Sequence, residues 1–392
     1  MNEYYKKSKI KKAIRITLLV LTGLTLCLGI FFYGIIHNYI NKMNFTNSKE
    51  VIAKELANDS SLISELYPSE GSEGYLVDAD GTVIDSMQTQ VETSEENNNT
   101  TQGSSQDDIE SLEAQIIKNL DSDMEIKRNK KILNILLIGS DTINSGERGR
   151  SDCMILVTIN KDTKKIVATS FLRDIYLQIP GENNNRLNAS YAYGGADLLM
   201  ETMKDNFKIQ IDRYVLVDFS AFIEIIDVIG GITLEVEEAK LDIINEIMQV
   251  NSEDTKENIN TDNLTKLGTC QLNGDQALSY ARNRSSVNGD FDRTNRQRKV
   301  LAAIYEKVKN LNFLELNKLF NTILPQVTTN FTESGIFKQL LSIPAYTNYN
   351  MEQWSVPMEG TYTNMRIRNM AVLGIDFEEN IEEIQHRLYE MK

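Results

Sequence analysis

The chain has 392 residues, of which 41 are basic and 56 acidic, and carries a formal charge of −15 at pH 7. So acidic a protein is a poor partner for nucleic acid, because that binding depends on a broad basic surface that neutralises phosphates. His37 and His386 are its two histidines, one at the end of an apolar run and one in a predicted C-terminal surface helix, which argues against a histidine-based triad or a zinc site. Neither GxGxxG nor GxxxxGK followed by Ser or Thr occurs, so those two nucleotide-binding loops are excluded.

The N-terminus predicts a membrane anchor. An apolar run of 21 residues, 16–36, follows a basic tail, 1–15, and about 20 apolar residues suffice to cross a bilayer as a helix. A cleaved signal peptide is the competing interpretation, but its apolar region is shorter and ends at small residues, whereas this run continues with FFYGIIHNYI. Six cations and one acid in the tail predict that it lies in the cytoplasm and that everything from about His37 lies outside. The expected location is therefore the cell membrane, with a single pass.

A low-complexity spacer is expected to follow the anchor over residues 37–129. Its stretch ETSEENNNTTQGSSQDD, 92–108, is typical of a segment with too few apolar residues to support a core. Only short helices at 48–66 and 108–119 are predicted there. Regularly spaced apolar runs begin at residue 130 and predict one compact extracytoplasmic domain over 130–392.

Apolar periodicity within this domain predicts alternating strands and helices. Strands are expected at 132–138, 154–159, 166–171, 214–217 and 232–236. Helices are expected at 196–207, 219–229, 274–281 and 293–309, in parts of 312–343, and around 377–391. This alternation predicts an α/β protein, an α/β/α sandwich with a mixed central sheet flanked by helices.

Charged residues follow the ends of the first three predicted strands. If these strands run antiparallel, the loop after the first places Asp141 and Asp152 at one sheet edge, and the third strand returns Arg173 and Asp174 to the same edge. Arg150 and Asp152, two apart in an extended segment, would share a face. Carboxylate oxygens suit Mg²⁺ or Mn²⁺, whose remaining ligands substrate phosphates can supply. Loop capping is the alternative role for the two aspartates.

The stretch 281–299, ARNRSSVNGDFDRTNRQRK, concentrates six cations in an acidic chain: Arg282, Arg284, Arg293, Arg296, Arg298 and Lys299. Arginine presents a planar fork of donors that suits phosphate, so the cluster predicts a site for a small anion. In the helix predicted from residue 293, Arg293 and Gln297 lie on or near the apolar face, beside backbone N–H groups that attract anions. Arg282 and Arg284 would point together if the segment RNR is extended. The alternative is a solvated helix face, or surface ion pairs with Asp290 and Asp292.

Three cysteines occur, of which Cys27 lies in the predicted membrane helix. A disulfide between Cys153 and Cys270 stays open, although their apolar neighbourhoods favour ordinary buried thiols.

Eight segments between about 130 and 310 occur in one order: NILLIGSD, RSDCMILVTIN, SFLRDIYLQIPG, RLNASYAYGGADLL, YVLVDFSAF, DVIGGITLEV, LNGDQALSYARNR and GDFDRTNRQRKVL. In this order they resemble the LytR-CpsA-Psr family of cell-wall glycopolymer ligases. The resemblance implies an α/β/α domain that binds a polyprenyl-pyrophosphate-linked glycopolymer, with the membrane lipid in an apolar pocket and the pyrophosphate held by arginines and Mg²⁺. It further implies transfer of the phospho-glycopolymer to peptidoglycan, with release of polyprenyl phosphate.

The resemblance also implies roles for individual residues. The metal-binding pair matches Asp141 and Asp152, and the first anion-binding arginine matches Arg173. The later set of site residues matches Arg282, Arg284, Arg293 and Gln297, and further pyrophosphate-binding candidates are Arg150 and Arg186. Asp174 or a metal-side aspartate would accept the hydroxyl proton. The chain departs from the family at Leu172, where Pro is frequent, and at Cys153, where Thr is frequent, so the loop that carries Arg173 is expected to be less rigid.

Two other classes of function stay open on the sequence alone. A non-catalytic envelope protein that binds lipid-linked polymer or senses the state of the wall would use the same residues, and only turnover distinguishes it. A cytoplasmic DNA-binding regulator is opposed by the predicted anchor and the acidic body. The sequence does not say whether the polymer is a teichoic acid, a capsule or another glycan.

Overall fold

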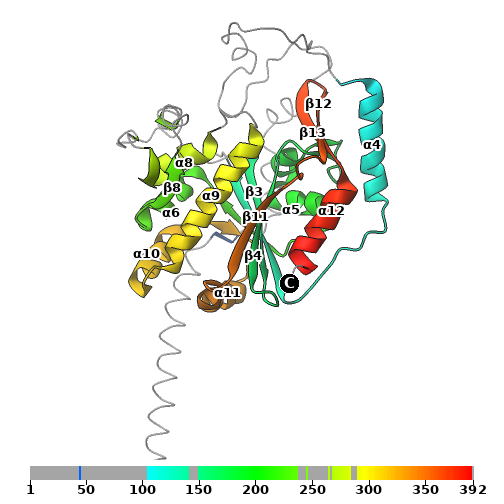
Figure 1. Ribbon diagram of the computed structural model, residues 1–392. Coiled ribbons are helices and arrows are strands. Elements are labelled where there is room, and N and C mark those ends of the chain that lie inside the picture. Colours follow the sequence, from blue (N-terminus) through cyan, green and yellow to red (C-terminus); the bar gives the residue numbers. More distant parts are fainter. Residues whose placement is uncertain are drawn as a thin grey trace, which may run out of the picture.

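A seven-stranded mixed sheet forms the centre of the molecule (Figure 1), in the order β1-β10-β7-β2-β3-β4-β11. The computed structural model describes residues 44–45, 104–140, 149–236, 244–245, 264, 267–283 and 289–390. The strands of this sheet are β1 (Asn44–Phe45), β2 (Ile132–Ser140), β3 (Ser151–Asn160), β4 (Lys165–Phe171), β7 (Arg213–Val217), β10 (Thr328–Thr329) and β11 (Asn350–Val356). Three two-stranded sheets are formed by β5 (Tyr176–Leu177) with β6 (Asn185–Arg186), β8 (Ile232–Val236) with β9 (Gly268–Leu272), and β12 (Tyr362–Ile367) with β13 (Met370–Ile375).

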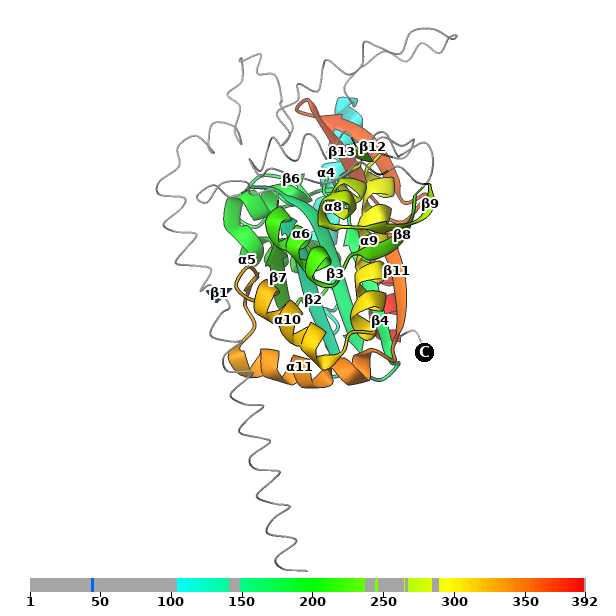
Figure 2. The same ribbon diagram turned by 90° about the vertical axis from the view of Figure 1, so that its left-hand side faces the viewer.

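Helices cover both faces of the large sheet. They are α4 (Gln106–Leu120), α5 (Leu187–Phe207), α6 (Phe219–Val228), α8 (Gly274–Arg282), α9 (Asp290–Lys309), α10 (Phe313–Ile323), α11 (Glu333–Tyr346), α12 (Phe377–Gln385) and the π-helical turn η2 (His386–Glu390). One face is covered by α5 and α12 with α4 outside them, the other by α6, α8, α9 and α10, and α11 crosses one end of the strands (Figures 1 and 2). The predicted α/β class, with a mixed central sheet between helices, is confirmed.

The antiparallel run of β2, β3 and β4 confirms the predicted topology. Met154 in β3 pairs with Ile138 in β2, and Ile155 pairs with Ser170 in β4. In β2, buried residues alternate with partly buried ones, so even-numbered residues such as Leu136 pack under α5 while odd-numbered ones face α6 and α9. The start of β3 and the end of β4 therefore meet at one sheet edge.

Helix α4 lies within the range expected to be spacer, yet it packs on the body. Leu112 and Ile116 are 4% and 0% exposed and belong to the main core, and the side-chain amide of Asn119 donates to the carbonyl oxygen of Asn206 at 2.8 Å. The compact domain therefore includes α4, whereas the sequence predicts that it begins at residue 130. The physical reason is an i, i+4 apolar spacing that forms a buried stripe despite polar surroundings.

The membrane prediction falls outside the described ranges, which contain neither residues 16–36 nor most of the spacer. Within those ranges, no helix has the length and hydropathy that crossing a bilayer requires.

Several elements differ from the sequence expectation. Helix α5 begins at Leu187 and continues through a kink at Gly194 and Gly195, whereas the prediction began after the glycines. Helix α9 begins at Asp290, one turn before the predicted start. Strand β11 and the hairpin β12–β13 were not predicted; β11 pairs parallel with β4 and forms the edge of the large sheet.

Candidate functional site

The site begins where β3 starts and β4 ends. Asp152 is the second residue of β3, and Arg173 follows β4 by two residues, so antiparallel pairing brings them together. The Nη1 of Arg173 donates to Oδ1 of Asp152 at 2.6 Å. Its Nε lies 3.6 Å from Oδ2 of Asp174 and 3.7 Å from Oδ1 of Asp290. The predicted meeting of Asp152, Arg173 and Asp174 at one sheet edge is confirmed.

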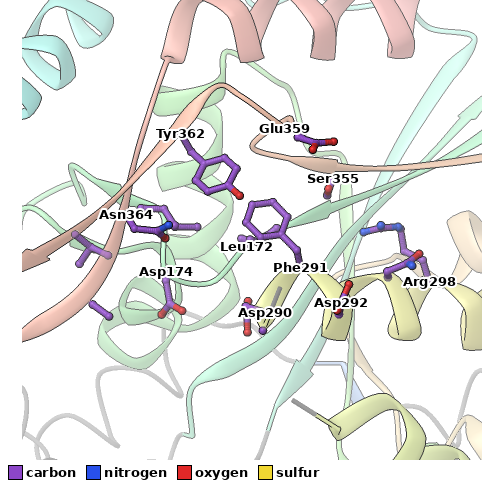
Figure 3. Close-up of a pocket in the computed structure, with 15 residues that line it drawn as sticks. Leu172, Asp174, Asp290, Phe291, Asp292, Arg298, Ser355, Glu359, Tyr362 and Asn364 are labelled. Carbon is purple, nitrogen blue, oxygen red and sulfur yellow. The ribbon is translucent and has the colours of Figure 1, made fainter. Parts of the chain in front are cut away.

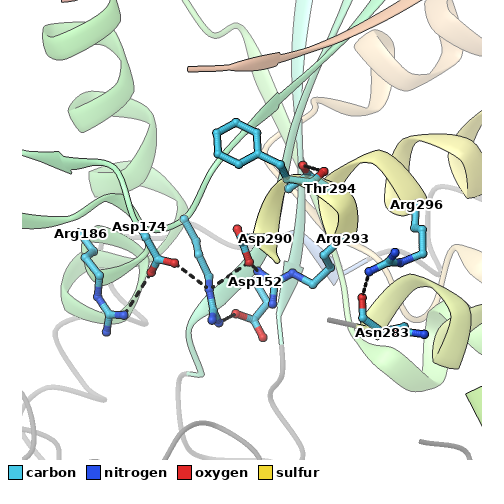
Figure 4. Close-up of polar contacts among 10 residues, drawn as sticks. Asp152, Asp174, Arg186, Asn283, Asp290, Arg293, Thr294 and Arg296 are labelled. Carbon is cyan, nitrogen blue, oxygen red and sulfur yellow. Dashed lines mark hydrogen bonds and ion pairs between the residues drawn. The ribbon is translucent and has the colours of Figure 1, made fainter. Parts of the chain in front are cut away.

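Two more arginines extend this group into a row of alternating charge (Figure 4). Arg186, the last residue of β6, donates to Asp174 at 3.1 Å, and Nη2 of Arg293 on α9 lies 2.5 Å from Oδ1 of Asp290. The carboxylates neutralise guanidiniums that would otherwise repel one another. We refer to Asp152, Arg173, Asp174, Arg186, Asp290 and Arg293 as the ion-pair row.

Burial and neighbouring charges act in opposite directions on the arginines of the row. Burial works to lower the pKa of Arg173, but Asp152, Asp174 and Asp290 outweigh it and raise the pKa above its ordinary value. The pKa of Arg186 is lowered, chiefly by burial, which Asp174 opposes and Arg150 reinforces. The buried Nε atoms of Arg173, Arg186 and Arg293 have no hydrogen-bond partner among the described residues, although that of Arg173 lies within 3.7 Å of two carboxylates.

An apolar cavity of about 270 Å³ opens beside the row, between the sheet and α6, α8 and α9. Its walls are mostly aliphatic and aromatic, and its polar lining includes Asp152, Arg282, Arg293 and Gln297. The side chain of Arg293 is only 2% exposed, and the buried Oε1 of Gln297 has no donor within the described ranges. The predicted placement of Arg293 and Gln297 on the buried face of their helix is therefore confirmed. An apolar cavity that ends at guanidiniums suits a ligand with an apolar tail and an anionic head.

The arginines of the stretch 281–299 do not form one site. Arg282 lies in the last turn of α8, not in an extended segment, and its guanidinium stacks 4.8 Å from the ring centre of Phe219 at the cavity wall. Arg296 donates to the carbonyl oxygen of Asn283 and so ties α9 to the end of α8. Arg298 faces the opposite side of α9 and lines a different cleft.

Two predicted site residues, Asp141 and Arg284, lie outside the described residues, so the metal pair Asp141 and Asp152 stays a prediction. Within the ranges described here, no three His, Cys, Asp or Glu side chains are placed to hold a metal ion together. Cys153 and Cys270 are both free thiols, and burial raises the pKa of Cys153 to about 12.

A second cleft, of about 750 Å³, includes Asp174 and Asp290 of the row in its lining (Figure 3). It is bounded by the first turns of α9, the end of β11 and the β12–β13 hairpin. We call it the hairpin cleft. Sequence reasoning missed it because the hairpin turn consists of Arg368 and Asn369, both at positive φ, rather than the Asn-Gly or Asp-Gly pair that signals such a turn.

The comparisons with known proteins agree with this geometry. The LytR_cpsA_psr family model matches residues 82–389. Regulatory protein MsrR of Staphylococcus aureus is 31% identical over 61% of this chain and 68% of its own. The polyisoprenyl-teichoic acid–peptidoglycan teichoic acid transferase TagU of Enterococcus faecalis is 35% identical over 55% of this chain and 65% of its own. A solved structure of TagT bound to LIIa-WTA superposes with a TM-score of 0.54 at 26% identity, covering 67% of this chain and 93% of that one.

Proposed function

The chain belongs to the LytR_cpsA_psr family, and we propose that it moves a glycopolymer phosphate from a polyprenyl-pyrophosphate carrier to a sugar hydroxyl of peptidoglycan. The observation that carries the proposal is the apolar cavity whose polar end holds Arg282 and Arg293. A polyprenyl chain fits apolar walls, and a pyrophosphate fits guanidiniums at the end of such a cavity. The name of TagU, a relative, describes a donor and an acceptor of this chemistry.

The reaction needs charge neutralisation and positioning more than covalent chemistry. The hydroxyl oxygen bonds to the phosphorus that carries the polymer, the bond from that phosphorus to the bridging oxygen breaks, and the electron pair leaves with polyprenyl phosphate. In our proposal the guanidinium groups of Arg173 and Arg293 hold the pyrophosphate oxygens, and Arg282 and Arg186 complete the cationic surroundings. Arg150 and Arg284 stay proposed members of the same set.

Mg²⁺ or Mn²⁺ would be held by Asp152 together with Asp141. Asp152 fits this role because it presents a carboxylate at the row, and hard oxygen ligands suit these ions. Such an ion would supply further neutralisation of the pyrophosphate charge. Its binding would compete with the 2.6 Å contact between Arg173 and Asp152.

We further propose that the chain is anchored in the cell membrane by residues 16–36, with the catalytic domain outside. The cavity would then receive the lipid of a carrier that resides in the same membrane. Protease added to intact protoplasts should digest the domain, whereas protection until lysis would contradict this orientation.

The test of the function is a transfer assay with the purified full-length chain. Lipid-linked polymer carrying a radioactive label is incubated with peptidoglycan, and the label that stays in the washed peptidoglycan is counted. We expect time-dependent attachment that lysozyme digestion releases as labelled fragments. Binding of the lipid without attachment would favour the non-catalytic class of envelope protein.

A further inference from the structure

Helix α9 separates two cavities of different character. Its face with Arg293, Gln297 and Val300 lines the apolar cavity, and its face with Phe291, Asn295 and Arg298 lines the hairpin cleft. At 100° per residue these two faces point about 160° apart. The ion-pair row lies where the two cavities approach each other, because Asp152 and Arg293 line one of them and Asp174 and Asp290 line the other.

The geometry of phosphoryl transfer gives these two sides different roles. Attack on phosphorus is in line, so the incoming hydroxyl approaches opposite the leaving oxygen. If the lipid phosphate leaves from the apolar cavity, the hydroxyl has to arrive from the other side of the row. The hairpin cleft occupies that side.

A buried cation, Arg298, lines the cleft. Arg298 is 7% exposed, and within the described part of the chain its Nε and Nη1 atoms have no hydrogen-bond partner. Burial lowers its pKa to about 10, so the guanidinium stays charged at neutral pH. A buried, unpaired charge destabilises a folded protein, and such groups are typically retained where a ligand completes them.

The remaining lining is typical of a sugar-binding site. Phe291 and Tyr362 stack with ring centres 4.7 Å apart at 29°, and both line the cleft, so the stacked pair presents an aromatic surface on which the C–H face of a sugar ring can pack. Ser355 and Asn364 supply hydroxyl and amide groups. A cleft volume of 750 Å³ lies within the range of about 300–1,000 Å³ for small-ligand sites.

Charge in the cleft disfavours the anionic donor polymer. Asp292 and Glu359 line it in addition to the two aspartates of the row. Repeated phosphates would be repelled by these carboxylates, whereas an acetylated sugar would not. The acyl and carboxylate oxygens of such a sugar can accept hydrogen bonds from Arg298.

We propose that the hairpin cleft binds the acceptor, a glycan strand of peptidoglycan, with a sugar ring on Phe291 and Tyr362 and an acyl or carboxylate oxygen accepting from Arg298. This inference rests on the proposed transferase function and names its acceptor site. The free hydroxyl of the sugar then points to Asp290, whose buried Oδ2 has no donor among the described residues. As the bond to phosphorus forms and polyprenyl phosphate leaves, the hydroxyl proton passes to this oxygen.

The experiment measures binding of a peptidoglycan tetrasaccharide to the full-length chain by calorimetry, in the absence of donor, so that no turnover is needed. Arg298→Gln should weaken binding roughly 10- to 100-fold, because a hydrogen bond to a charged group is lost. Tyr362→Ala should weaken it roughly 5- to 10-fold through loss of the stacking face. Arg366→Gln is the matched control, since Arg366 lies exposed on the same strand as Tyr362, and its dissociation constant should stay within about twofold of wild type.

Folding is checked on the same samples by thermal denaturation. Arg298→Gln removes a buried charge whose Nε and Nη1 have no hydrogen-bond partner among the described residues, so its melting temperature should equal or exceed that of wild type. Weakened binding by a variant that is at least as stable cannot come from unfolding.

Each result decides one claim. No binding by wild type, or equal binding by all three variants, would overturn the acceptor cleft. Displacement of the tetrasaccharide by soluble polyglycerol phosphate, abolished in Arg298→Gln, would assign the cleft to the donor polymer and equally overturn the proposal. If the wild type binds the tetrasaccharide but transfers no polymer to peptidoglycan, the cleft assignment stands and the proposed reaction is contradicted.

Discussion

Arg173 holds together three carboxylates that would otherwise repel one another. Its contacts with Asp152, Asp174 and Asp290 span 2.6 to 3.7 Å, and its side chain is 17% exposed. The residue therefore has a structural role in addition to its proposed contact with pyrophosphate. A substitution that removes its charge affects both roles.

We expect Arg173→Ala and Arg173→Lys to separate these roles. Arg173→Ala should lower the free energy of unfolding by about 3 kcal/mol, because it leaves partly buried carboxylates without their cation. Arg173→Lys keeps the charge and most of that stability but cannot reproduce the fork of donors, so transfer should still fall at least about tenfold. Urea denaturation and the transfer assay measure the two effects. Wild-type transfer by Arg173→Lys at full stability would remove the guanidinium from the mechanism.

Cys153 gives a pH-dependent prediction. Burial raises its pKa from 9.0 to about 12, so in the folded protein at pH 9 its thiolate fraction, and with it the rate of alkylation by iodoacetamide, should be roughly 500-fold below that of a free thiol. Because the unfolded thiol ionises first, the free energy of unfolding should fall as pH rises from about 9 to about 12. Peptide mass spectrometry before and after denaturation in urea reports the modification at this residue. Rapid alkylation of Cys153 in the folded protein would contradict the raised pKa of its thiol.

At the scale of elements, α4 provides a test of where the folded body begins. Ile116 is 0% exposed in the main core, while its neighbour Ile117 is 58% exposed. Ile116→Ala should lower the free energy of unfolding by about 2–5 kcal/mol, whereas Ile117→Ala should change it by less than about 0.5 kcal/mol. Thermal denaturation of the two variants compares them directly. If Ile116→Ala lowered the free energy of unfolding as little as Ile117→Ala does, α4 would contribute nothing to the core.

The sequence predicted the sheet centre well because its strands are strongly apolar and joined by short polar turns. The same topology correctly placed Asp152, Arg173 and Asp174, since strand direction alone fixes which ends meet. The hairpin cleft could not be predicted, because it depends on β12–β13, a hairpin of mixed polarity without an Asn-Gly or Asp-Gly turn. From the sequence, Arg298 is indistinguishable from the other cations of 281–299. The fold shows that it faces the hairpin cleft, away from Arg293.

At the scale of the whole molecule, the account assigns donor and acceptor to cavities on opposite faces of α9, with the ion-pair row between them. This arrangement requires a specific bond to break. The polymer phosphate stays with the polymer, and the carrier leaves with a single phosphate.

The mass of the lipid product tests this claim most directly. The purified full-length chain is incubated with lipid-linked polymer and peptidoglycan, and the lipid fraction is analysed by mass spectrometry. The account predicts polyprenyl monophosphate in a one-to-one ratio to attached polymer, and neither product when Arg293 is replaced by Ala. Polyprenyl pyrophosphate as the product would mean that the sugar–oxygen bond breaks instead, and would contradict phosphoryl transfer.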